Sequence, residues 1–490
     1  METKYEKALK LILFVLILSI FSWWIAQKTN AQTSNKASQK YNILFIAVDD
    51  LRPELGVYGA NHIQSPAIDK LASQSLIFDR AYCNVPVCGA SRASFLSGVR
   101  PGRNRFLDYD TKIDEDFPGI TSLPKHFKNN GYTTISNGKV YHHLSDDKTA
   151  WDKVWSGKQL VARDYTSPEN INLEHTPGSR GFFFEKANVA DNAYLDGKTA
   201  DKTIKDLKKL KAEGKPFFLA AGFLKPHLPF NAPIKYWNLY DSTKISLPKN
   251  YEQPKSTPSV AFNNFGELRS YTGIPKEGPL SNQTAKKMIH GYYASVSYVD
   301  AQIGKVLNAL EELGLAENTI VVLWGDHGWN LGDHQLWCKH NNFATALRVP
   351  LLIKVPNKTT GQRSNAIVEY IDVYPSLAEL AGLPIPAHTN GESLVSLLDG
   401  KTRKKDFAIS KYLDGITLVK GELFYTEWLD KENKIKDRML FDHAKDPLEF
   451  NNLAEKPDYA KKTKELSDFL HQNWGEDFFL DRKKSDISPK

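Results

Sequence analysis

Three short apolar runs along the chain each end in polar or ionisable side chains. Residues 43–48 run into two aspartates, residues 217–224 into a lysine and a histidine, and residues 319–324 into an aspartate and a histidine. Continuous apolar runs rich in β-branched residues are typical of strands buried on both faces of a parallel sheet. Because ligands of open α/β sheets bind at the carboxyl ends of the strands, the pattern predicts one shared site. Its predicted members are Asp49, Asp50, His227, Asp326 and His327.

The segments between these runs contain apolar residues at helical spacing. Residues 201–211 place Ile204, Leu207 and Leu210 on one face, and residues 291–313 show the same period before a glycine stops it. The alternation of strands and helices predicts an α/β fold, with a large sheet between layers of helices.

Two other regions differ in character. Residues 240–283 are rich in Pro, Asn, Ser and Gly, and we interpret them as a long insertion over the sheet that shapes a substrate cleft. Beyond them the chain shows short strand-like pieces, such as residues 416–429, and a closing helix at residues 458–473. We therefore divide the chain into a catalytic domain, residues 41–400, and a C-terminal α+β subdomain, residues 401–490.

The N-terminal residues have the order of a secretory signal. Three lysines precede the apolar run of residues 11–26, and a polar stretch follows. We interpret residues 1–31 as a signal peptide cleaved after Ala31, and residues 32–40 as a linker. An uncleaved membrane anchor is the alternative, although the run is shorter than the roughly 20 residues that span a bilayer. The interpretation predicts an exported protein, periplasmic or secreted, with no membrane span after cleavage.

Composition excludes several classes of protein. The net charge is +7, but no long basic run is present, so we do not expect nucleic-acid binding. The three cysteines are too few for a disulfide scaffold, and their spacing matches no zinc site. An odd number of cysteines in an exported protein points to one that is free or chemically altered.

Several polar motifs have ordinary explanations when they are taken singly. An Asp-Asp pair after a strand is common turn chemistry, and solvated loops would explain Lys139, His142, His227 and Lys339. Together, however, the motifs combine carboxylates for a hard cation, Ca²⁺ or Mg²⁺, with lysine and histidine donors. This combination describes a site for a bound oxyanion.

The stretch CGASRASFLSG predicts a helix that begins near Cys88 and ends at Gly98. A helix N-terminus presents free N–H groups and a partial positive charge to an anion. Arg92 adds a fixed charge one turn later. Residue 88 would therefore lie where a sulfate or a phosphate binds.

CGASR also matches the signature Cys-x-(Pro or Ala)-x-Arg, and the chain resembles the type I sulfatases of the alkaline-phosphatase superfamily. It is most similar to the iduronate-2-sulfatase branch, in segments such as VDDLRPELGVYG, GKVYH, FLKPHLPF and DHGWNLGDHQLWCK. The resemblance runs from about residue 41 to 385. It implies the alkaline-phosphatase-like fold, a large mixed, mostly parallel sheet sandwiched by helices, plus a smaller C-terminal domain with an antiparallel sheet.

In this family a maturase oxidises the signature cysteine to formylglycine (3-oxoalanine), and the site binds one Ca²⁺. The resemblance assigns the calcium ligands to Asp49, Asp50, Cys88, Asp326 and His327. It also assigns catalytic roles: Cys88 as nucleophile after conversion, Arg92 to hold the hydrate, Lys139 and Lys339 to clamp sulfate, His142 to assist the hydrate, and His227 to protonate the leaving sugar oxygen.

The implied reaction uses both hydroxyls of the hydrated aldehyde. One attacks sulfur and displaces the sugar alcohol, and the other, once deprotonated, expels sulfate. Ala90 departs from the family pattern, because most members have Pro there, and this leaves the efficiency of maturation open. Cys83 and Cys338 either pair with each other or remain reduced and buried.

The leading hypothesis is a sulfatase that acts on a sulfated polysaccharide or its oligosaccharides, at a uronate. Candidate substrates are 2-sulfated iduronate or glucuronate of glycosaminoglycans, and the algal polysaccharide ulvan. A phosphatase or phosphodiesterase of the same superfamily would use Ser or Thr as nucleophile, usually with two metals, which Cys88 and the lysine pair argue against. A catalytically silent polysaccharide-binding relative would tolerate loss of the Lys and His set, which is complete here.

Overall fold

The computed structural model describes residues 3–6, 9, 40–157 and 163–474. The predicted signal peptide and linker lie outside the described residues, except for residues 3–6, 9 and 40. Among the helices of the described part, none is long and apolar enough to cross a membrane. The described residues from Tyr41 to Trp474 belong to one compact unit, which contains all the elements below.

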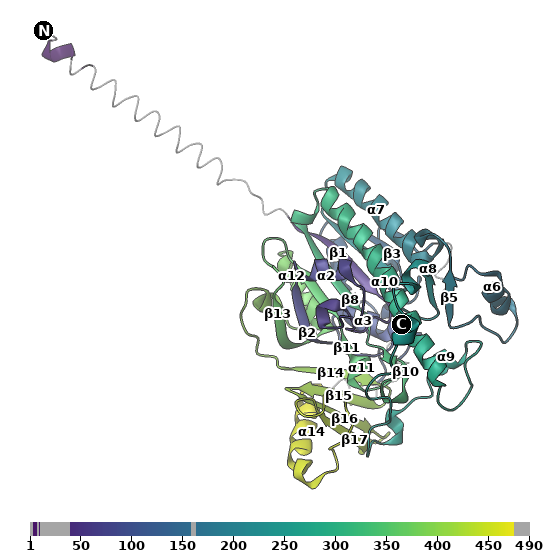
Figure 1. Ribbon diagram of the computed structural model, residues 1–490. Coiled ribbons are helices and arrows are strands. Elements are labelled where there is room, and N and C mark those ends of the chain that lie inside the picture. Colours follow the sequence, from purple (N-terminus) through teal and green to yellow (C-terminus); the bar gives the residue numbers. More distant parts are fainter. Residues whose placement is uncertain (1–2, 7–8, 10–39, 158–162, 475–490) are drawn as a thin grey trace. The chain divides into compact units, whose positions relative to one another are not determined.

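The centre of this unit is a nine-stranded mixed sheet (Figure 1). Strands β8, β1, β6, β3 and β4 run parallel to one another, and β12 and β11 run antiparallel to their neighbours. In spatial order the strands are β11 (Arg348–Val349), β2 (Leu76–Tyr82), β12 (Leu351–Lys354), β8 (Thr319–Gly325), β1 (Asn42–Val48), β6 (Phe217–Phe223), β3 (Thr133–Gly138) and β4 (Lys153–Trp155), with β13 (Arg363–Glu369) paired to β2. The three predicted strands are thus β1, β6 and β8, side by side at the centre.

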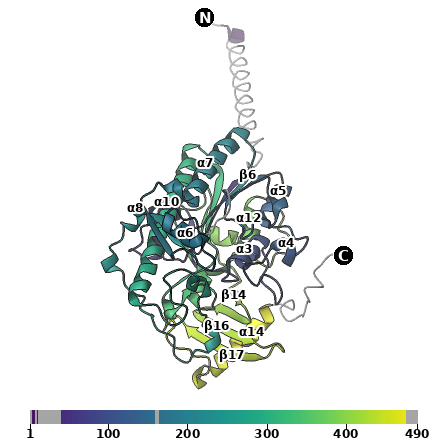
Figure 2. The same ribbon diagram turned by 90° about the vertical axis from the view of Figure 1, so that its right-hand side faces the viewer.

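Two hydrophobic cores cover the two faces of the sheet. Along β1, alternate side chains point to opposite cores: Phe45 packs in one and Ile46 in the other. Every residue of β1, β6 and β8 is buried, as the continuous apolar runs predicted. One core includes α2 (Pro66–Ala72), α7 (Leu195–Glu213) and α10 (Asn282–Glu312), and the other α3 (Cys88–Ser97), α5 (Leu123–Asn129) and α12 (Val373–Leu380). Figure 2 shows α10 and α3 on opposite sides of the sheet.

Both predicted helices are present and are longer than expected. The amphipathic pattern of residues 201–211 lies inside α7, and that of residues 291–313 falls in α10, which the structure ends at Glu312. α10 begins earlier because the Ser281 side chain accepts a hydrogen bond from the backbone N–H of Thr284, which caps the helix N-terminus.

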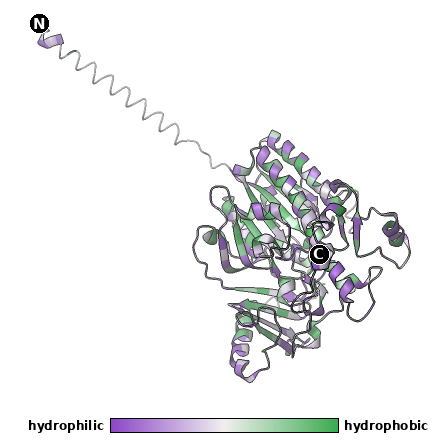
Figure 3. Cartoon of the chain, viewed as in Figure 1, coloured by the Kyte–Doolittle hydropathy of each residue, from purple (hydrophilic) through white to green (hydrophobic). Residues whose placement is uncertain are grey.

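A second, antiparallel sheet follows the main one along the chain. Its four strands are β14 (Phe407–Tyr412), β15 (Gly415–Lys420), β16 (Leu423–Leu429) and β17 (Ile435–Asp442). One face packs into the main core and the other against α14 (Ala460–Trp474), the predicted closing helix. Figure 3 shows the mixture of apolar and polar positions along α14, whose apolar residues Leu466 and Leu470 join this smaller core. The predicted fold class is therefore confirmed.

The region predicted as an insertion, residues 240–283, contains little regular structure. Its longest helix is α9 (Gly266–Arg269), and Phe265, just before it, has φ of 42°. Leu268 and Tyr271 anchor the segment in the core shared with α7 and α10. This anchoring brings α9 to the carboxyl edge of the sheet, next to β10 (Trp337–Cys338).

Candidate active site

The carboxyl ends of β1 and β8 bring the two acidic motifs together. Parallel pairing sets Val48 opposite Gly325, so Asp49, Asp50 and Asp326 leave the sheet side by side. The backbone N–H of Asp50 donates to Oδ1 of Asp326 at 2.9 Å. All three carboxylates are fully buried. The sequence pattern thus located this cluster, and the structure gives its geometry.

Helix α3 delivers Cys88 to the same place. Cys88 is its first residue, and Gly98 ends the helix in the left-handed conformation with φ of 70°. Sγ of Cys88 lies 3.1 Å from Nε2 of His327 and 3.9 Å from Oδ1 of Asp50. A Cβ at Gly89 would collide with the backbone carbonyl of Tyr109, which explains why a glycine follows the cysteine.

Cys88 lies in surroundings that disfavour a thiolate. Burial raises the pKa of the Cys88 thiol well above its ordinary value, and Asp49 and Asp326 raise it further, although Lys339 opposes them. A thiol is a nucleophile only as its thiolate, so an unmodified Cys88 is poorly suited to that role. The other two cysteines, Cys83 and Cys338, also lie in the described part of the chain, and each is a buried free thiol.

Arg92 ties the acidic cluster to the helix and to the loop after β3. Its Nη2 lies 2.9 Å from Oδ1 of Asp49 and 3.0 Å from Oδ2 of Asp326. Its Nη1 donates to the backbone carbonyls of Lys139 and Val140. Burial would lower the pKa of Arg92, but Asp326 and Asp49 outweigh it and raise the pKa. Arg92 therefore joins three segments and carries a permanent charge.

Two buried lysines face the aspartate pair from different loops. Lys139, after β3, contacts Asp49, and Nζ of Lys339 lies 3.1 Å from Oδ1 of Asp50. Burial alone would lower the pKa of each lysine, but the carboxylates outweigh it and raise both. Both side chains are thus held as cations.

Three histidines line the cluster. His327 lies 3.3 Å from Oδ1 of Asp50 through Nε2, while its Nδ1 lies 2.9 Å from the carbonyl oxygen of Gly328. His227, on the loop after β6, brings Nε2 within 3.9 Å of Oδ2 of Asp50. Burial and the nearby Lys139 lower the pKa of His142 to about 2. Its Nδ1 is buried without a hydrogen-bond partner among the described residues.

Glu267, at the start of α9, completes the site, and sequence reasoning missed it. Its Oε1 lies 3.2 Å from Nε2 of His227, and its Oε2 lies 2.9 Å from Nζ of Lys339. Burial raises the pKa of Glu267, but Lys339 and His227 outweigh it and hold the pKa well below its ordinary value. The surrounding FNNFGELRS has neither strand nor long helix periodicity, so only the folded insertion reveals this carboxylate.

Four of the five predicted metal ligands form one group. Ligand atoms of Asp50, Cys88, Asp326 and His327 all lie within 4.8 Å of one another. Burial, together with the neighbouring Asp49, raises the pKa of Asp50 to about 7 despite Lys339. Hard carboxylate oxygens in such surroundings fit Ca²⁺ or Mg²⁺. Asp49, the fifth predicted ligand, is not in this group, and its carboxylate forms ion pairs with Arg92 and Lys139.

The mixed sheet between layers of helices, with a helix N-terminus and buried charges at its carboxyl edge, is an alkaline-phosphatase-like α/β fold. Two solved structures share this fold. One, described in complex with its substrate D-glucosamine-2-N,6-O-disulfate, has a TM-score of 0.73 and 23% identity, over 91% of this chain and 99% of that chain. The other, a phosphonate monoester hydrolase from Silicibacter pomeroyi, has a TM-score of 0.75 and 22% identity, over 88% and 95%.

Sequence comparison narrows this class. The family model Sulfatase matches residues 41–383, and the model N-sulphoglucosamine sulphohydrolase, C-terminal, matches residues 332–475. Iduronate 2-sulfatase of Mus musculus is 36% identical over 415 residues, which cover 75% of this chain and 73% of the relative. The chain belongs to the sulfatase family, as its motifs predicted, and is a sulfuric ester hydrolase.

Proposed function

We propose that the protein hydrolyses sulfate esters of uronate-containing glycans through a formylglycine formed from Cys88. One observation carries the proposal: Cys88 opens α3 at 3.1 Å from His327, inside a buried cluster of carboxylates and lysines. A helix N-terminus and fixed cations stabilise an anion that water cannot reach.

We assign one Ca²⁺ to the acidic cluster. Asp50, Asp326, His327 and residue 88 would hold the ion, with Asp49 as a fifth ligand once its lysine contact loosens. A bound Ca²⁺ supplies positive charge that holds a sulfate group and favours the attacking oxygen. The buried grouping of these ligand atoms within 4.8 Å of one another supports this assignment.

A formylglycine hydrate at residue 88 would supply one hydroxyl as the nucleophile that displaces the sugar alcohol from sulfur, and a second whose deprotonation would release sulfate and restore the aldehyde. Arg92, fixed by two aspartates, orients residue 88. Lys139 and Lys339 bind the sulfate oxygens as permanent cations. His142 is neutral, because burial and Lys139 lower its pKa to about 2, and its unpartnered Nδ1 is placed to accept a hydrogen bond from the hydrate.

His227 donates a proton to the departing sugar oxygen in this scheme. Nδ1 of His227 lies against the carbonyl oxygen of Leu228, and Nε2 lies 3.2 Å from Glu267. Burial, Lys339 and Lys139 lower the pKa of His227, and the Glu267 carboxylate opposes this shift and orients the ring. We propose Glu267 as a positioning residue for His227.

The substrate assignment rests on the relatives. Iduronate 2-sulfatase is the name of the 36% identical relative, which favours a 2-sulfated uronate. Ulvan, which also contains iduronate, is the second candidate polysaccharide. We further propose that the protein is exported after cleavage of residues 1–31, that a maturase converts Cys88, and that residues 41–400 and 401–490 form the catalytic and C-terminal parts.

Sulfate release tests this function. Matured protein with Ca²⁺ is incubated with unsaturated glycosaminoglycan disaccharides and, separately, with ulvan oligosaccharides, beside Cys88→Ala protein. Release from one panel, absent in Cys88→Ala, supports the proposal and identifies the glycan. Mass spectrometry of the peptide containing residue 88 reports its conversion. A confirmed aldehyde with no release from either panel would overturn the uronate assignment.

A further inference from the structure

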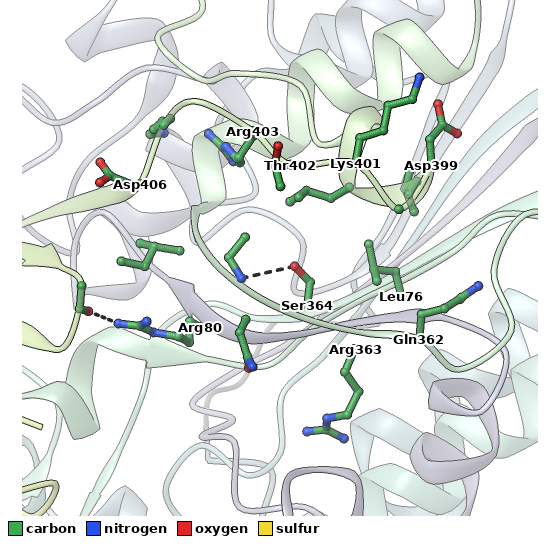
Figure 4. Close-up of a pocket in the computed structure, with 18 residues that line it drawn as sticks. Leu76, Arg80, Gln362, Arg363, Ser364, Asp399, Lys401, Thr402, Arg403 and Asp406 are labelled. Carbon is green, nitrogen blue, oxygen red and sulfur yellow. Dashed lines mark hydrogen bonds between the residues drawn. The ribbon is translucent and has the colours of Figure 1, made fainter. Parts of the chain in front are cut away.

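A second cavity lies beside the edge strand β13, away from the carboxyl ends of the central strands. Its volume is about 820 Å³, and β2, β13 and residues 397–406 line it. Figure 4 shows Arg80 and Ser364 along one side of the cavity and Thr402 and Arg403 along the other. The volume lies within the usual range for ligand pockets, about 300–1,000 Å³.

A buried ion network stands behind this cavity. The carboxylates of Glu369 and Asp372 are fully buried, and three cations contact them. Nη2 of Arg100 lies 2.5 Å from Oε2 of Glu369, Nζ of Lys405 lies 2.7 Å from Oδ1 of Asp372, and Nη1 of Arg403 lies 2.9 Å from Oδ2 of Asp372. Lys405 also contacts Glu369. Three cations therefore share two carboxylates where water is largely excluded.

Arg403 has the spare hydrogen-bonding capacity. Its side chain is only 4% exposed, yet within the described residues its Nε and Nη2 have no hydrogen-bond partner. The carboxylate of Glu392 stays 3.7 Å from Nη2 and is more than half exposed. Buried donors are normally satisfied, and a guanidinium fork matches the two oxygens of a carboxylate or a sulfate. Arg403 thus points to an anionic ligand in the cavity that it lines.

The other charged groups that line the cavity do not offset the excess of cations over carboxylates in this network. Lys401 adds an exposed cation on the same side as Arg403. Most of the remaining charged groups pair with groups outside the lining: Arg80 with Glu422, Arg363 with Asp79, Asp399 with Lys358 and Asp406 with Lys420.

The uncharged part of the lining suits a sugar. Amide and hydroxyl groups come from Gln362, Ser364, Asn365 and Thr402, and aliphatic side chains include Leu397. We propose that this cavity is a secondary glycan subsite, in which Arg403 binds the carboxylate or sulfate of one sugar unit while the reacting ester occupies the active site. The class of glycan rests on the proposed function. Two-point binding would favour long substrates over short ones.

Two variants of the matured, Ca²⁺-loaded enzyme test the subsite. Arg403→Lys keeps a cation beside Asp372 but removes the free guanidinium donors, and Thr402→Trp fills the cavity while leaving the ion network intact. We expect each to raise KM for the sulfated polysaccharide about fivefold. Both kcat and KM for a sulfated monosaccharide should stay unchanged. Arg438→Lys, on the second sheet, is the matched control.

Calorimetric titration of a sulfated tetrasaccharide into Cys88→Ala protein separates binding from catalysis. We expect one binding event, because both contacts are made by one molecule, and the Arg403→Lys and Thr402→Trp backgrounds should each weaken it about fivefold. Unchanged binding and unchanged polymer KM in both variants would overturn the subsite. If inorganic sulfate abolished the Arg403-dependent part of the affinity and no saccharide competed for it, the assignment to a glycan would be overturned. An Arg403-dependent event in a protein that releases no sulfate would retain the subsite and reject the proposed function.

Discussion

Oε1 of Glu267 lies 3.2 Å from Nε2 of His227, inside the cluster formed by the carboxyl ends of the central strands. The same carboxylate also reaches Lys339, at 2.9 Å. The insertion of residues 240–283 therefore places a carboxylate against two of the predicted catalytic side chains. A carboxylate in this position orients the histidine and opposes the lowering of its pKa by burial, Lys339 and Lys139.

Replacing Glu267 should affect poor leaving groups selectively. General acid–base catalysis contributes roughly 10²–10⁴-fold, and a weakened acid should cost about 10- to 100-fold in kcat on a sugar sulfate. A nitrophenyl sulfate loses its phenolate without a proton, so Glu267→Gln should leave its turnover nearly unchanged. Steady-state kinetics on both esters measures the difference.

His227→Ala should also lower kcat on the sugar sulfate more than kcat on the nitrophenyl sulfate, and by a larger factor than Glu267→Gln. Glu252→Gln, an exposed substitution in the same insertion, serves as the control. Equal losses on both esters would show instead that Glu267 acts through Lys339 and sulfate binding.

Stabilisation by Ca²⁺ should depend on Asp326. Its Oδ1 accepts from the backbone of Asp50 and its Oδ2 from Nε of Arg92, so Asp326→Asn keeps the shape but removes a charge. Saturating Ca²⁺, at about 100 times its Kd, should add about 2.7 kcal/mol to the stability of the native protein, and a chelator should reverse this. Differential scanning calorimetry should show the Tm increase in the native protein and none in Asp326→Asn.

The matched variant for this measurement is Asp300→Asn. Asp300 is also buried, but its carboxylate accepts from the backbone of Ala67 and Ile68 at the start of α2. Asp300→Asn should lower the Tm of the calcium-free protein and keep the full increase in Tm on addition of Ca²⁺. A calcium response that survives in Asp326→Asn would exclude the assigned cation site.

The start of α3 should tolerate no side chain at residue 89. A Cβ there meets the backbone carbonyls of Asp108 and Tyr109, which cannot move as a side chain does. Gly89→Ala should therefore displace Cys88 and lower activity at least about tenfold, because displacements near 1 Å cost about 10²-fold. Gly102→Ala has its nearest neighbour at 3.6 Å and should be neutral. Activity per aldehyde-bearing molecule, with Tm, measures the effect.

The part of the site that follows the strands could be predicted from the sequence. Buried parallel strands require continuous apolar runs, and their order in the chain fixes where Asp49, Asp326 and His227 emerge. Glu267 could not be predicted, because its position depends on the path of an irregular insertion. The pairing of Asp49 with Arg92 and Lys139 also depends on side-chain geometry that no spacing encodes.

Acid should weaken the ion network behind the second cavity. Burial raises the pKa of Glu369, but Arg100 and Lys405 outweigh it and lower the pKa to about 2 from an ordinary 4.5. A depressed carboxylate pKa contributes stability that is complete above the ordinary value and is lost as pH falls toward the folded value. The contribution of Glu369 to the free energy of unfolding, about 3 kcal/mol, should therefore disappear between about pH 4.5 and 2.

Glu369→Gln should remove this acid-dependent part and expose its structural role. At neutral pH the variant leaves Arg100 and Lys405 short of a buried partner, which should cost about 3–5 kcal/mol. Below about pH 4.5 its stability should fall less steeply than that of the native protein, because the carboxylate that gains a proton is gone. Glu422→Gln, which breaks the exposed pair with Arg80, should cost no more than about 1 kcal/mol at any pH. Denaturant unfolding from neutral to acidic pH measures all three, and parallel curves for the native protein and Glu369→Gln would contradict the depressed pKa.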